Sequence, residues 1–405
     1  MTKRIVIAGA GHAAGQVIAT LKQRKYAGKI VLVGNEAHLP YQRPPLSKKF
    51  LAGSLAAERL HFKPKSFYDD PQIELHLNTC AAYVDRDGKA LITNRGDTVA
   101  YDKLVLALGS RARKLSLPGA NLEGVHYLRT IADVESIRAE FANAKHVLIV
   151  GAGYIGLEVA AVMRQLGLEV TVVEMADRVM SRVVSAEISD FYQIEHTNQG
   201  VKLRLSTSIA GFVGESRVTA VKTTDGDDIP TDFVIVGIGI IPNTELGTDA
   251  DLDVDDGIVV NDQCQTSDPN IYAVGDCTSH PNAIYDRLLR LESVHNALEQ
   301  AKTAASNICG KETHYSQVPW FWSDQFDLKL QIAGLSAGYD EVVIRGNPAD
   351  RSFACLYLRN GRLIATDAVN APRDFVHSKM LIASHAKIDR EKLADINTPL
   401  KELVK

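Results

Sequence analysis

A chain of 405 residues is too long for one hydrophobic core, so we expect two or three domains. Its ordinary composition, with 45% hydrophobic and 23% charged residues, excludes a disordered, collagen-like or low-complexity protein. The formal net charge of −4 argues against a nucleic-acid-binding protein, because such proteins usually carry a basic surplus.

The cysteine pattern indicates a reduced, cytoplasmic protein. The five cysteines are an odd number, so they cannot all pair, and no two have CxxC or CxxxxC spacing. We therefore expect reduced, mostly buried thiols. No stretch approaches the roughly 18 uninterrupted apolar residues of a membrane-spanning helix, so we also expect no membrane association.

Two similar segments, whose first glycines are 142 residues apart, organise the chain. Residues 3–24 read KRIVIAGAGHAAGQVIATLKQR, and residues 145–166 read KHVLIVGAGYIGLEVAAVMRQL. In each, a β-branched apolar run turns through glycines into a helical pattern. A second strand follows, at 29–36 and at 169–174. Each copy therefore predicts a right-handed βαβ unit.

The first copy contains Gly9-x-Gly11-x-x-Ala14, a form of the dinucleotide-binding fingerprint with alanine in the third glycine position. Its second strand ends in Asn35 and Glu36, which are candidates for binding a ribose. The alternative is a glycine turn with a purely structural role, which the second, matching copy disfavours.

The second copy contains the complete fingerprint Gly151-x-Gly153-x-x-Gly156. In this pattern the first glycine permits a tight turn, the second lets a pyrophosphate approach the backbone, and the third allows close packing of helix on strand. The helix N-terminus then faces the anion. Glu174 ends the next strand, where it is suited to bind a ribose diol and to repel a 2′-phosphate. A solvated strand-end acid is the alternative.

The two fingerprints together imply two dinucleotides in one chain. FAD and a pyridine nucleotide are the usual pair, because a flavin accepts the hydride of a nicotinamide. The acid in the second copy favours NADH, whereas Arg178 and Arg182, which follow it closely, leave NADPH open as the alternative.

Further apolar runs complete the pattern. Those at 103–108, 232–236 and 271–274 meet a glycine at their carboxyl ends, where ligands bind in open α/β sheets. From about residue 312 an aromatic cluster and alternating strand-like runs follow, with two helices expected near 371–386 and 390–394.

The sequence thus predicts an α/β protein with two doubly wound, Rossmann-like nucleotide-binding domains and a C-terminal α+β domain with an antiparallel sheet. The predicted FAD-binding domain is discontinuous and comprises residues 1–112 and 240–314. The NAD-binding domain comprises residues 113–239, and a C-terminal interface domain comprises residues 315–405.

Six segments carry a family resemblance. They are YQRPPLSK at 41–48, LALGS at 106–110, VGIGIIPN at 236–243, TSDPNIYAVGD at 266–276, RLESVHNA at 290–297 and WFWSD at 320–324. They resemble the two-dinucleotide-binding flavoproteins, in the ferredoxin reductase branch of the putidaredoxin reductase type. Those oxidoreductases serve bacterial haem monooxygenases and Rieske-type dioxygenases. The resemblance covers nearly the whole chain, although Leu108 replaces the usual threonine.

The resemblance implies roles on the flavin side. Asp276 would accept hydrogen bonds from the ribityl chain, and Lys48 would place a positive charge beside the flavin and stabilise its reduced form. Arg43 and Arg129 are candidates for the pyrophosphate or adenine side, and the backbone of Val294 for the pyrimidine ring. The alternatives are a turn aspartate, an exposed lysine, surface arginines and a core valine.

Lys48 and Glu158 are the candidate catalytic residues. Glu158, placed in the first helical turn, contacts the nicotinamide amide or pairs with Lys48 when NADH is absent; the alternative is a favourable helix-dipole placement. Trp320 and Trp322 would face one side of a strand, where they shield the flavin, conduct electrons or pack in a core.

The candidate cofactor-binding residues lie at strand ends, in helix starts and in the resembling segments. For FAD they are Gly9, Gly11, His12, Ala13, Ala14, Asn35, Glu36, Arg43, Lys48, Ala81, Ala107, Gly109, Arg129, Gly275, Asp276, Glu292, Ser293, Val294 and Trp322. For NAD they are Gly151, Gly153, Tyr154, Ile155, Gly156, Glu158, Glu174, Arg182, Gly237, Ile238 and Gly239.

The electron acceptor is expected to be external. Residues 38–52 hold no cysteine, whereas disulfide reductases of this fold carry a CxxxxC pair there, so electron transfer into a dithiol is excluded. The sequence also has no metal-ligand pattern. The resemblance implies an NADH-dependent ferredoxin reductase in which FAD takes a hydride and passes single electrons onward.

The resemblance further implies a small, acidic 2Fe–2S ferredoxin that feeds a haem monooxygenase. Lys302, Lys379 and Lys401 are the candidate docking residues, and solvated surface lysines are the alternative for each. We expect a monomer or weak dimer. Alternative functions are a reductase for rubredoxin or for a dioxygenase ferredoxin, and a non-enzymatic, redox-sensing flavoprotein.

Overall fold

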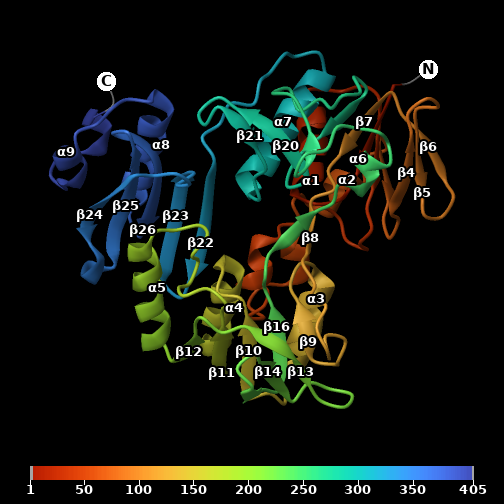
Figure 1. Cartoon of the computed structure of the whole chain (residues 1–405). Coiled ribbons are helices and arrows are strands. Elements are labelled where there is room, and N and C mark those ends of the chain that lie inside the picture. The colour runs from red at the N-terminus through yellow and green to blue at the C-terminus, as the bar shows by residue number, and fades with distance from the viewer. Residues whose placement is uncertain (1–2, 404–405) are drawn as a thin grey trace. The chain divides into compact units, whose positions relative to one another are not determined.

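The computed structural model describes residues 3–403, which divide into two compact units (Figure 1). The first unit comprises Met1–Arg43, Ala57–Arg111 and Ile241–Pro319. The second comprises Pro44–Ala56, Ala112–Ile240 and Trp320–Lys405. Both units are therefore assembled from segments that are distant in sequence.

The first unit is built on a five-stranded parallel sheet in the order β19-β7-β1-β2-β3. Its central strands are almost wholly buried, which explains their continuous β-branched sequence. The strands are β1 (Arg4–Ala8), β2 (Lys29–Val33), β3 (Ile73–His76), β7 (Lys103–Leu106) and β19 (Ile271–Ala273).

Both faces of this sheet are covered. Ile5 and Ile7 point to one face, where they pack with the helices α1 (His12–Gln23) and α7 (Val294–Ile308). Val6 points to the other face, towards an antiparallel sheet of β4 (Ala81–Asp85), β5 (Ala90–Thr93) and β6 (Thr98–Ala100). Shorter elements are η2 (Ala57–Leu60), α2 (Lys65–Tyr68), α6 (Glu245–Thr248), β18 (Ile258–Val259), β20 (Thr278–Asn282) and β21 (Arg287–Leu289). A separate two-stranded sheet joins β8 (Ser110–Ala112) and β17 (Ile240–Pro242).

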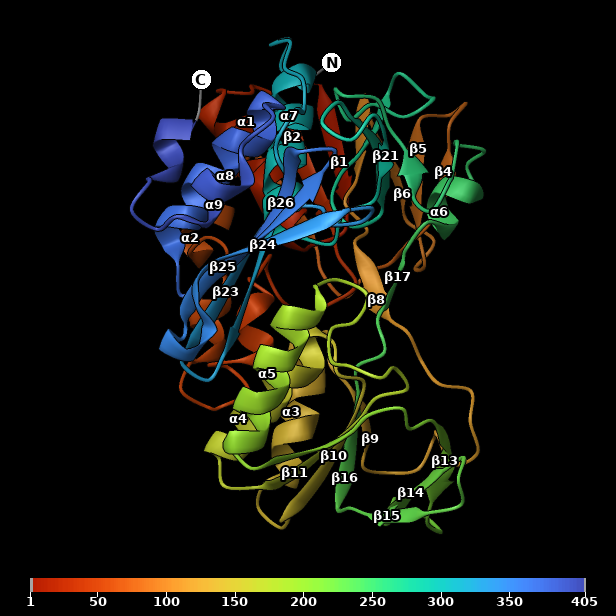
Figure 2. The same cartoon turned by 60° about the vertical axis from the view of Figure 1, so that its left-hand side comes forward.

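The second unit repeats the parallel sheet, in the order β12-β11-β10-β16-β9. Helices α3 and α4 lie on one face and the small sheet β13-β14-β15 on the other, as Figure 2 shows. The elements are β9 (Val125–Tyr127), α3 (Ile131–Glu140), β10 (His146–Val150), α4 (Tyr154–Gln165), β11 (Glu169–Val173), α5 (Ala186–Asn198), β12 (Val201–Arg204), β13 (Ile209–Val213), β14 (Ala220–Thr223), β15 (Asp228–Pro230) and β16 (Phe233–Val236).

The C-terminal part of the second unit is an antiparallel sheet in the order β22-β23-β26-β25-β24. On α5, the ring of Phe191 lies 5.0 Å from that of Phe353 on this sheet. The remaining elements are η1 (Pro44–Ser47), β22 (Trp320–Gln325), β23 (Leu328–Gly334), β24 (Glu341–Asn347), η3 (Pro348–Asp350), β25 (Ser352–Arg359), β26 (Arg362–Val369), α8 (Pro372–Ser384), α9 (Arg390–Ala394) and η4 (Leu400–Leu403). The predicted fold class is confirmed, with two Rossmann-like sheets and a C-terminal antiparallel sheet.

No helix within residues 3–403 is long and apolar enough to span a bilayer.

Candidate functional site

In the first unit, the predicted fingerprint residues form a turn between β1 and α1. Gly9 has φ +109°, and a Cβ there would lie 2.1 Å from the carbonyl oxygen of Ala107, so the position requires glycine. Gly11 is the N-cap of α1 and provides no side-chain cap. A Cβ on Gly11 would meet no protein atom within 4 Å. The turn therefore leaves open space in front of the helix N-terminus.

A chain of polar side chains runs beside this turn, within the first unit. Glu36 accepts hydrogen bonds from the Tyr41 hydroxyl at 2.6 Å and from Arg43 at 2.9 Å. Arg43 lies close enough to Asp276 for the carboxylate to favour its charge, and Asp276 accepts a hydrogen bond from Ser110 at 2.8 Å. Sequence analysis did not select Tyr41 or Ser110 individually, although both lie in the segments that carried the resemblance.

Hydrogen bonds to a side chain of α7 anchor the turn after β19. Gln300 accepts hydrogen bonds from the backbone N–H of Gly275 at 2.7 Å and from the Thr278 hydroxyl at 3.0 Å. Both interactions are buried. They fix the backbone on either side of Asp276, so that its carboxylate has a defined position at the carboxyl edge of the sheet.

The second unit contains an equivalent turn between β10 and α4. Gly151 has φ +103°, and a Cβ there would lie 2.4 Å from the Gly237 carbonyl oxygen. A Cβ on Gly156 would lie 2.0 Å from the Gly151 carbonyl oxygen, so this glycine lets the helix approach the strand. Gly153, the N-cap, again faces open space and provides no side-chain cap. The three glycines thus have the three geometries that the fingerprint requires.

Glu174 is anchored beside this turn. Its carboxylate accepts backbone N–H groups from Ala152 at 2.7 Å and from Ala176 at 2.9 Å. Arg178, which left NADPH open in the sequence, donates to the carbonyl oxygens of Val184 and Ser181 and to a serine hydroxyl. Its guanidinium is therefore used in bracing its own loop.

Glu158 lies at the centre of a buried polar cluster in the second unit. One carboxylate oxygen, Oε2, accepts hydrogen bonds from Lys48 Nζ at 2.6 Å and from Ser47 Oγ at 2.5 Å. The other, Oε1, accepts one from Ser323 Oγ at 2.7 Å. Glu158 is only 1% exposed. Because α4 begins at Tyr154, Glu158 is the fifth helical residue and lies in the second turn, so its predicted placement in the first turn was wrong.

Lys48 reaches this cluster because its segment is packed into the second unit. Phe50 and Leu51 are buried, and the guanidinium of Arg138 on α3 lies 5.9 Å from the centre of the Phe50 ring. The short helix η1 ends at Ser47, so Ser47 and Lys48 both reach the same carboxylate oxygen. Ser47 and Lys48 are thus held in place by the apolar packing of the residues that follow them.

The two tryptophans of β22 lie together, with ring centroids 5.5 Å apart. Trp320 also packs on Phe375 of α8, and the ammonium of Lys379 lies 5.6 Å from the centre of the Trp320 ring. On the opposite face of the strand, Phe321 packs on Tyr154 at the start of α4. The strand therefore contacts the nucleotide-binding helix on one side and α8 on the other.

The remaining candidate residues are divided between the two units. In the first unit, His12, Ala13 and Ala14 begin α1, Ala81 begins β4, Ala107 and Gly109 follow β7, and Ser293 and Val294 begin α7. Asn35 is exposed, and the exposed Glu292 is paired with Arg290. In the second unit, Arg129 precedes α3, Ile155 lies in the first turn of α4, Ile238 and Gly239 follow β16, and Arg182 is exposed.

Three residues predicted on the FAD side belong to the second unit. Lys48, Arg129 and Trp322 lie there, whereas the other candidate FAD residues lie in the first unit. Of the candidate docking residues, Lys302 is in the first unit and pairs with Glu299 at 2.6 Å. Lys401 is exposed on the C-terminal segment of the second unit.

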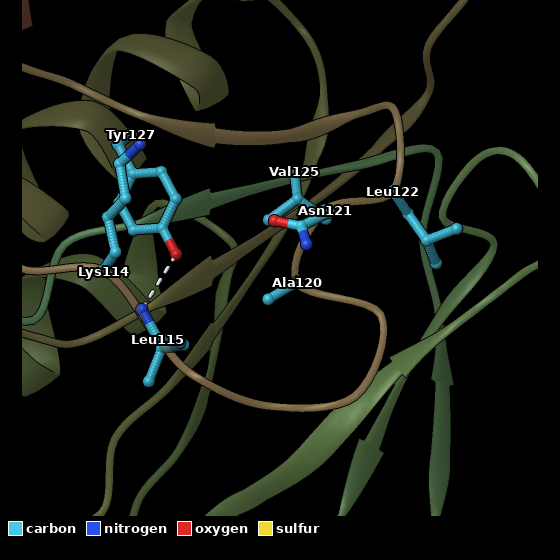
Figure 3. A pocket seen from close by; sticks show the side chains of 7 residues that line it. All are labelled: Lys114, Leu115, Ala120, Asn121, Leu122, Val125 and Tyr127. Atoms are coloured by element: carbon cyan, nitrogen blue, oxygen red, sulfur yellow. Dashed lines mark hydrogen bonds between the residues drawn. The ribbon is translucent and has the colours of Figure 1, made fainter.

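A separate pocket of about 250 Å³ lies in the second unit (Figure 3). The hydroxyl of Tyr127 accepts a hydrogen bond from the Leu115 backbone N–H across it. None of the candidate site residues lines this pocket. The candidate nucleotide-binding residues therefore lie at the open glycine turns and not in this pocket.

The two turns fit dinucleotides on structural grounds. Both helices begin without a side-chain cap and without an acidic residue in the first turn, which leaves the positive end of each helix dipole for an anion. A strand-end carboxylate, Glu36 or Glu174, lies beside each turn. Within the described residues there is no cluster of side chains that could hold a metal ion.

The cysteines are all free thiols. Cys277, which directly follows Asp276, is completely buried, and burial raises the pKa of its thiol to about 11. Its sulfur lies 3.5 Å from the Val274 carbonyl oxygen as a hydrogen-bond donor. This thiol therefore stays protonated at neutral pH and has a packing role.

Residues 3–301 match the pyridine nucleotide-disulphide oxidoreductase family, and residues 320–404 match the reductase C-terminal family. A ferredoxin reductase subunit of 5,5′-dehydrodivanillate O-demethylase from a Sphingobium species is 44% identical, over 98% of this chain and 97% of the relative. A rubredoxin-NAD(+) reductase of Pseudomonas putida is 40% identical, over 91% of this chain and 96% of the relative.

Two solved structures are similar over nearly their full length. The ferredoxin reductase for the CYP199A2 system of Rhodopseudomonas palustris has a TM-score of 0.96 and 43% identity, with 100% of both chains covered. The reductase of the covalent putidaredoxin reductase–putidaredoxin complex also has a TM-score of 0.96, with 41% identity, over 99% of this chain and 98% of that one.

Proposed function

The chain belongs to the pyridine nucleotide-disulphide oxidoreductase family, and we propose that it is an NADH-dependent ferredoxin reductase. When bound, FAD supplies the redox chemistry: it accepts a hydride from NADH and returns electrons singly to a 2Fe–2S ferredoxin. In this proposal the ferredoxin feeds a haem monooxygenase. Members of this family use FAD and a pyridine nucleotide, and the chain is an oxidoreductase of this kind.

One observation carries this proposal above the others. The chain holds two open glycine turns at uncapped helix N-termini, and ferredoxin reductases match it over nearly its full length. The two turns support two dinucleotides, and the full-length match supports an external ferredoxin as acceptor. We also propose a division into residues 1–112 and 240–314 for FAD, 113–239 for NAD and 315–405 for the interface, with the insert Pro44–Ala56 packed into the second unit.

The first unit is proposed to hold FAD. Gly11 would admit the pyrophosphate to the N-terminus of α1, and Glu36, held by Arg43, would bind the adenosine ribose. Asp276 would bind the ribityl chain, because its turn is fixed by Gln300. The other candidate FAD residues of this unit surround the same strand ends.

The second unit is proposed to hold NADH. Gly153 would admit the pyrophosphate, and Glu174 would accept hydrogen bonds from the ribose diol. Glu158 and Lys48 would act at the nicotinamide side, where Glu158 exchanges its partner Lys48 for the nicotinamide amide. The loop-bracing hydrogen bonds of Arg178 support NADH as the preferred nucleotide, since they occupy the guanidinium nearest in sequence to Glu174.

The partner is proposed to be a small acidic ferredoxin that binds a basic surface. Of the three candidate lysines, Lys379 is the best supported, because it lies over the aromatic rings of Trp320 and Phe375. Lys302 already pairs with an acid, and Lys401 is exposed. Such an encounter would bury little area and weaken with salt. We place the reaction in the cytoplasm, where free thiols persist and NADH is available.

Anaerobic stopped-flow absorbance tests this function. Mixing the FAD-loaded protein with NADH should bleach the flavin band near ~450 nm, the region in which oxidised flavins absorb. Oxidised 2Fe–2S ferredoxin added next should restore the band rapidly. A protein that takes up no FAD, or a flavin that NADH does not reduce, would exclude the proposal.

Rubredoxin is the second candidate acceptor, because a rubredoxin reductase matches most of the chain. The same instrument separates the two. With equal concentrations of oxidised ferredoxin and rubredoxin, we expect faster reoxidation by ferredoxin. Faster reoxidation by rubredoxin would assign the chain to that branch, whereas a flavin that stays reduced with both would indicate the redox-sensing alternative.

A further inference from the structure

A continuous line of buried side chains leads from Glu158 across β22 to α5, within the second unit. Ser323 donates to Glu158 Oε1 at 2.7 Å, and Gln325 Nε2 lies 3.1 Å from Ser323 Oγ. Gln325 Oε1 lies 2.8 Å from His196 Nε2. Ser323, Gln325 and His196 are each 0% exposed. Figure 1 shows α4, β22 and α5, the elements that carry this line.

The donor and the acceptor of every hydrogen bond in this line follow from Glu158 at one end. Ser323 donates its single hydroxyl proton to Glu158 Oε1, so it has no second proton to give. Ser323 Oγ is then an acceptor for the Gln325 amide, which leaves the Gln325 carbonyl oxygen to accept from His196. His196 must therefore carry its proton on Nε2. Its Nδ1 has no hydrogen-bond partner among the described residues. This agrees with an unprotonated Nδ1, which has no N–H group that needs an acceptor.

The surroundings of His196 keep its imidazole neutral, which preserves these hydrogen-bond directions. Burial lowers the pKa of His196 to about 4, so the imidazole is neutral at physiological pH. Its ring packs against Phe326 at a centroid distance of 5.0 Å. Glu158 and Lys48 lie at the other end of the line. Asp324 on β22 and Glu195 on α5 are the neighbours in sequence of Gln325 and His196, and Glu195 is paired with Arg351.

We propose that Ser323 is a positioning residue for the Lys48–Glu158 pair, and that Gln325 and His196 hold its hydroxyl in the donating orientation. The two oxygens of Glu158 have different surroundings. Oε2 has two donors, Ser47 and Lys48, and is the oxygen that would exchange a partner when nicotinamide binds. Oε1 has Ser323, which is fully buried and keeps the carboxylate in place during that exchange. This inference rests on the proposed NADH-dependent function.

The first test compares Ser323→Ala, Ser323→Thr and Ser378→Ala as FAD-loaded full-length proteins. Ser378 is a matched control because it is equally buried in the same unit but its hydroxyl has no hydrogen-bond partner among residues 3–403. Loss of a hydrogen bond to a charged group corresponds to about tenfold in affinity. We therefore expect the Kd for NAD⁺, measured by calorimetric titration, to rise about tenfold in Ser323→Ala, with recovery in Ser323→Thr.

The same variants give a second readout in stopped-flow reduction by NADH. In Ser323→Ala, the NADH concentration that gives half-maximal reduction should rise about tenfold while the limiting rate changes little, because the carboxylate has lost the donor that holds it in place. In a Glu158→Gln background, Ser323→Ala should add little to either measurement. If Ser323→Ala matches Ser378→Ala in Kd and in the NADH concentration for half-maximal reduction, Ser323 has no positioning role.

Nitrogen NMR of histidine-labelled protein tests the direction of the line without any nucleotide. We expect His196 as the neutral Nε2–H tautomer down to about pH 5, one unit above its lowered pKa of about 4. An Nδ1–H tautomer would reverse the line and overturn its orienting role. Failure of the unmodified protein to bind NAD⁺ or to be reduced by NADH would instead overturn the proposed function, so the two failures are distinguishable.

Discussion

At the scale of single residues, Glu174 is the residue on which we propose that nucleotide choice depends. Replacing it with alanine removes a carboxylate that accepts two backbone N–H groups and faces the proposed ribose. We expect the ratio of kcat/KM for NADH to that for NADPH to fall by about tenfold or more in Glu174→Ala. Steady-state assays with both nucleotides measure it. Glu174→Gln removes the charge but keeps one acceptor oxygen, so it can preserve only one of the two backbone hydrogen bonds. An unchanged ratio in Glu174→Ala would show that the acid only braces the turn.

Lys379 is the proposed docking residue at which partner docking can be tested separately from hydride transfer. In Lys379→Glu we expect reoxidation by ferredoxin to slow about fivefold at low salt, because rim charges mainly set the association rate. Reduction by NADH should be unchanged. The exposed Lys222 on β14 provides a charge-matched control, Lys222→Glu. Equal slowing in both variants would mean that net charge, and not a docking surface, is responsible.

At the scale of elements, two glycines of one fingerprint have separable roles. A Cβ on Gly156 would collide with backbone, so Gly156→Ala should destabilise the second unit by about 1–3 kcal/mol. A Cβ on Gly153 meets no protein atom, so Gly153→Ala should leave the urea midpoint unchanged. It should nevertheless weaken NAD⁺ binding by at least about tenfold, because it fills the pyrophosphate space. Loss of stability without loss of binding in Gly153→Ala would contradict this assignment.

Also at this scale, the strands and turns show which features could be predicted from the sequence. Alternating and continuous apolar runs predicted β1, β2, β10 and β11, because buried parallel strands leave little choice of residue. The glycine turns were predictable for the same local reason. Ser323 was not selected, since its contact with Glu158 spans 165 positions and a serine in an aromatic strand carries no signal. His196 also carried no sequence signal for its place in the hydrogen-bond line.

At the scale of the whole molecule, three buried groups shape the pH dependence of stability. Burial lowers the pKa of His196 and of His280 to about 4, so stability is lost as pH falls from about 6.5 towards 4. Burial also raises the pKa of Asp367 to about 7, so stability is lost as pH rises from about 4 to 7. The opposing slopes place their combined optimum near pH ~6.5.

The variant Asp367→Asn isolates the alkaline side of this curve. The amide oxygen can still accept the Tyr357 hydroxyl, but the group no longer ionises. Relative to the unmodified protein, we expect a gain on the order of 4 kcal/mol at pH ~8 and of only about 1–2 kcal/mol at pH ~5, from urea unfolding at each pH. His280→Phe is expected to flatten the acidic side. Parallel curves for Asp367→Asn and the unmodified protein would show that Asp367 is not neutral in the folded state.

The membership of Pro44–Ala56 in the second unit has a practical consequence for protein engineering. A chimera that grafted only residues 113–239 from a relative would combine a foreign Glu158 with the resident Lys48 and Ser323, because these three residues come from three separate chain segments. To transplant the Lys48–Glu158–Ser323 cluster intact, the graft would have to include the short insert and the C-terminal sheet. Recombination libraries for this protein should therefore place their crossovers near Arg43, Ala56, Arg111, Ile240 and Pro319.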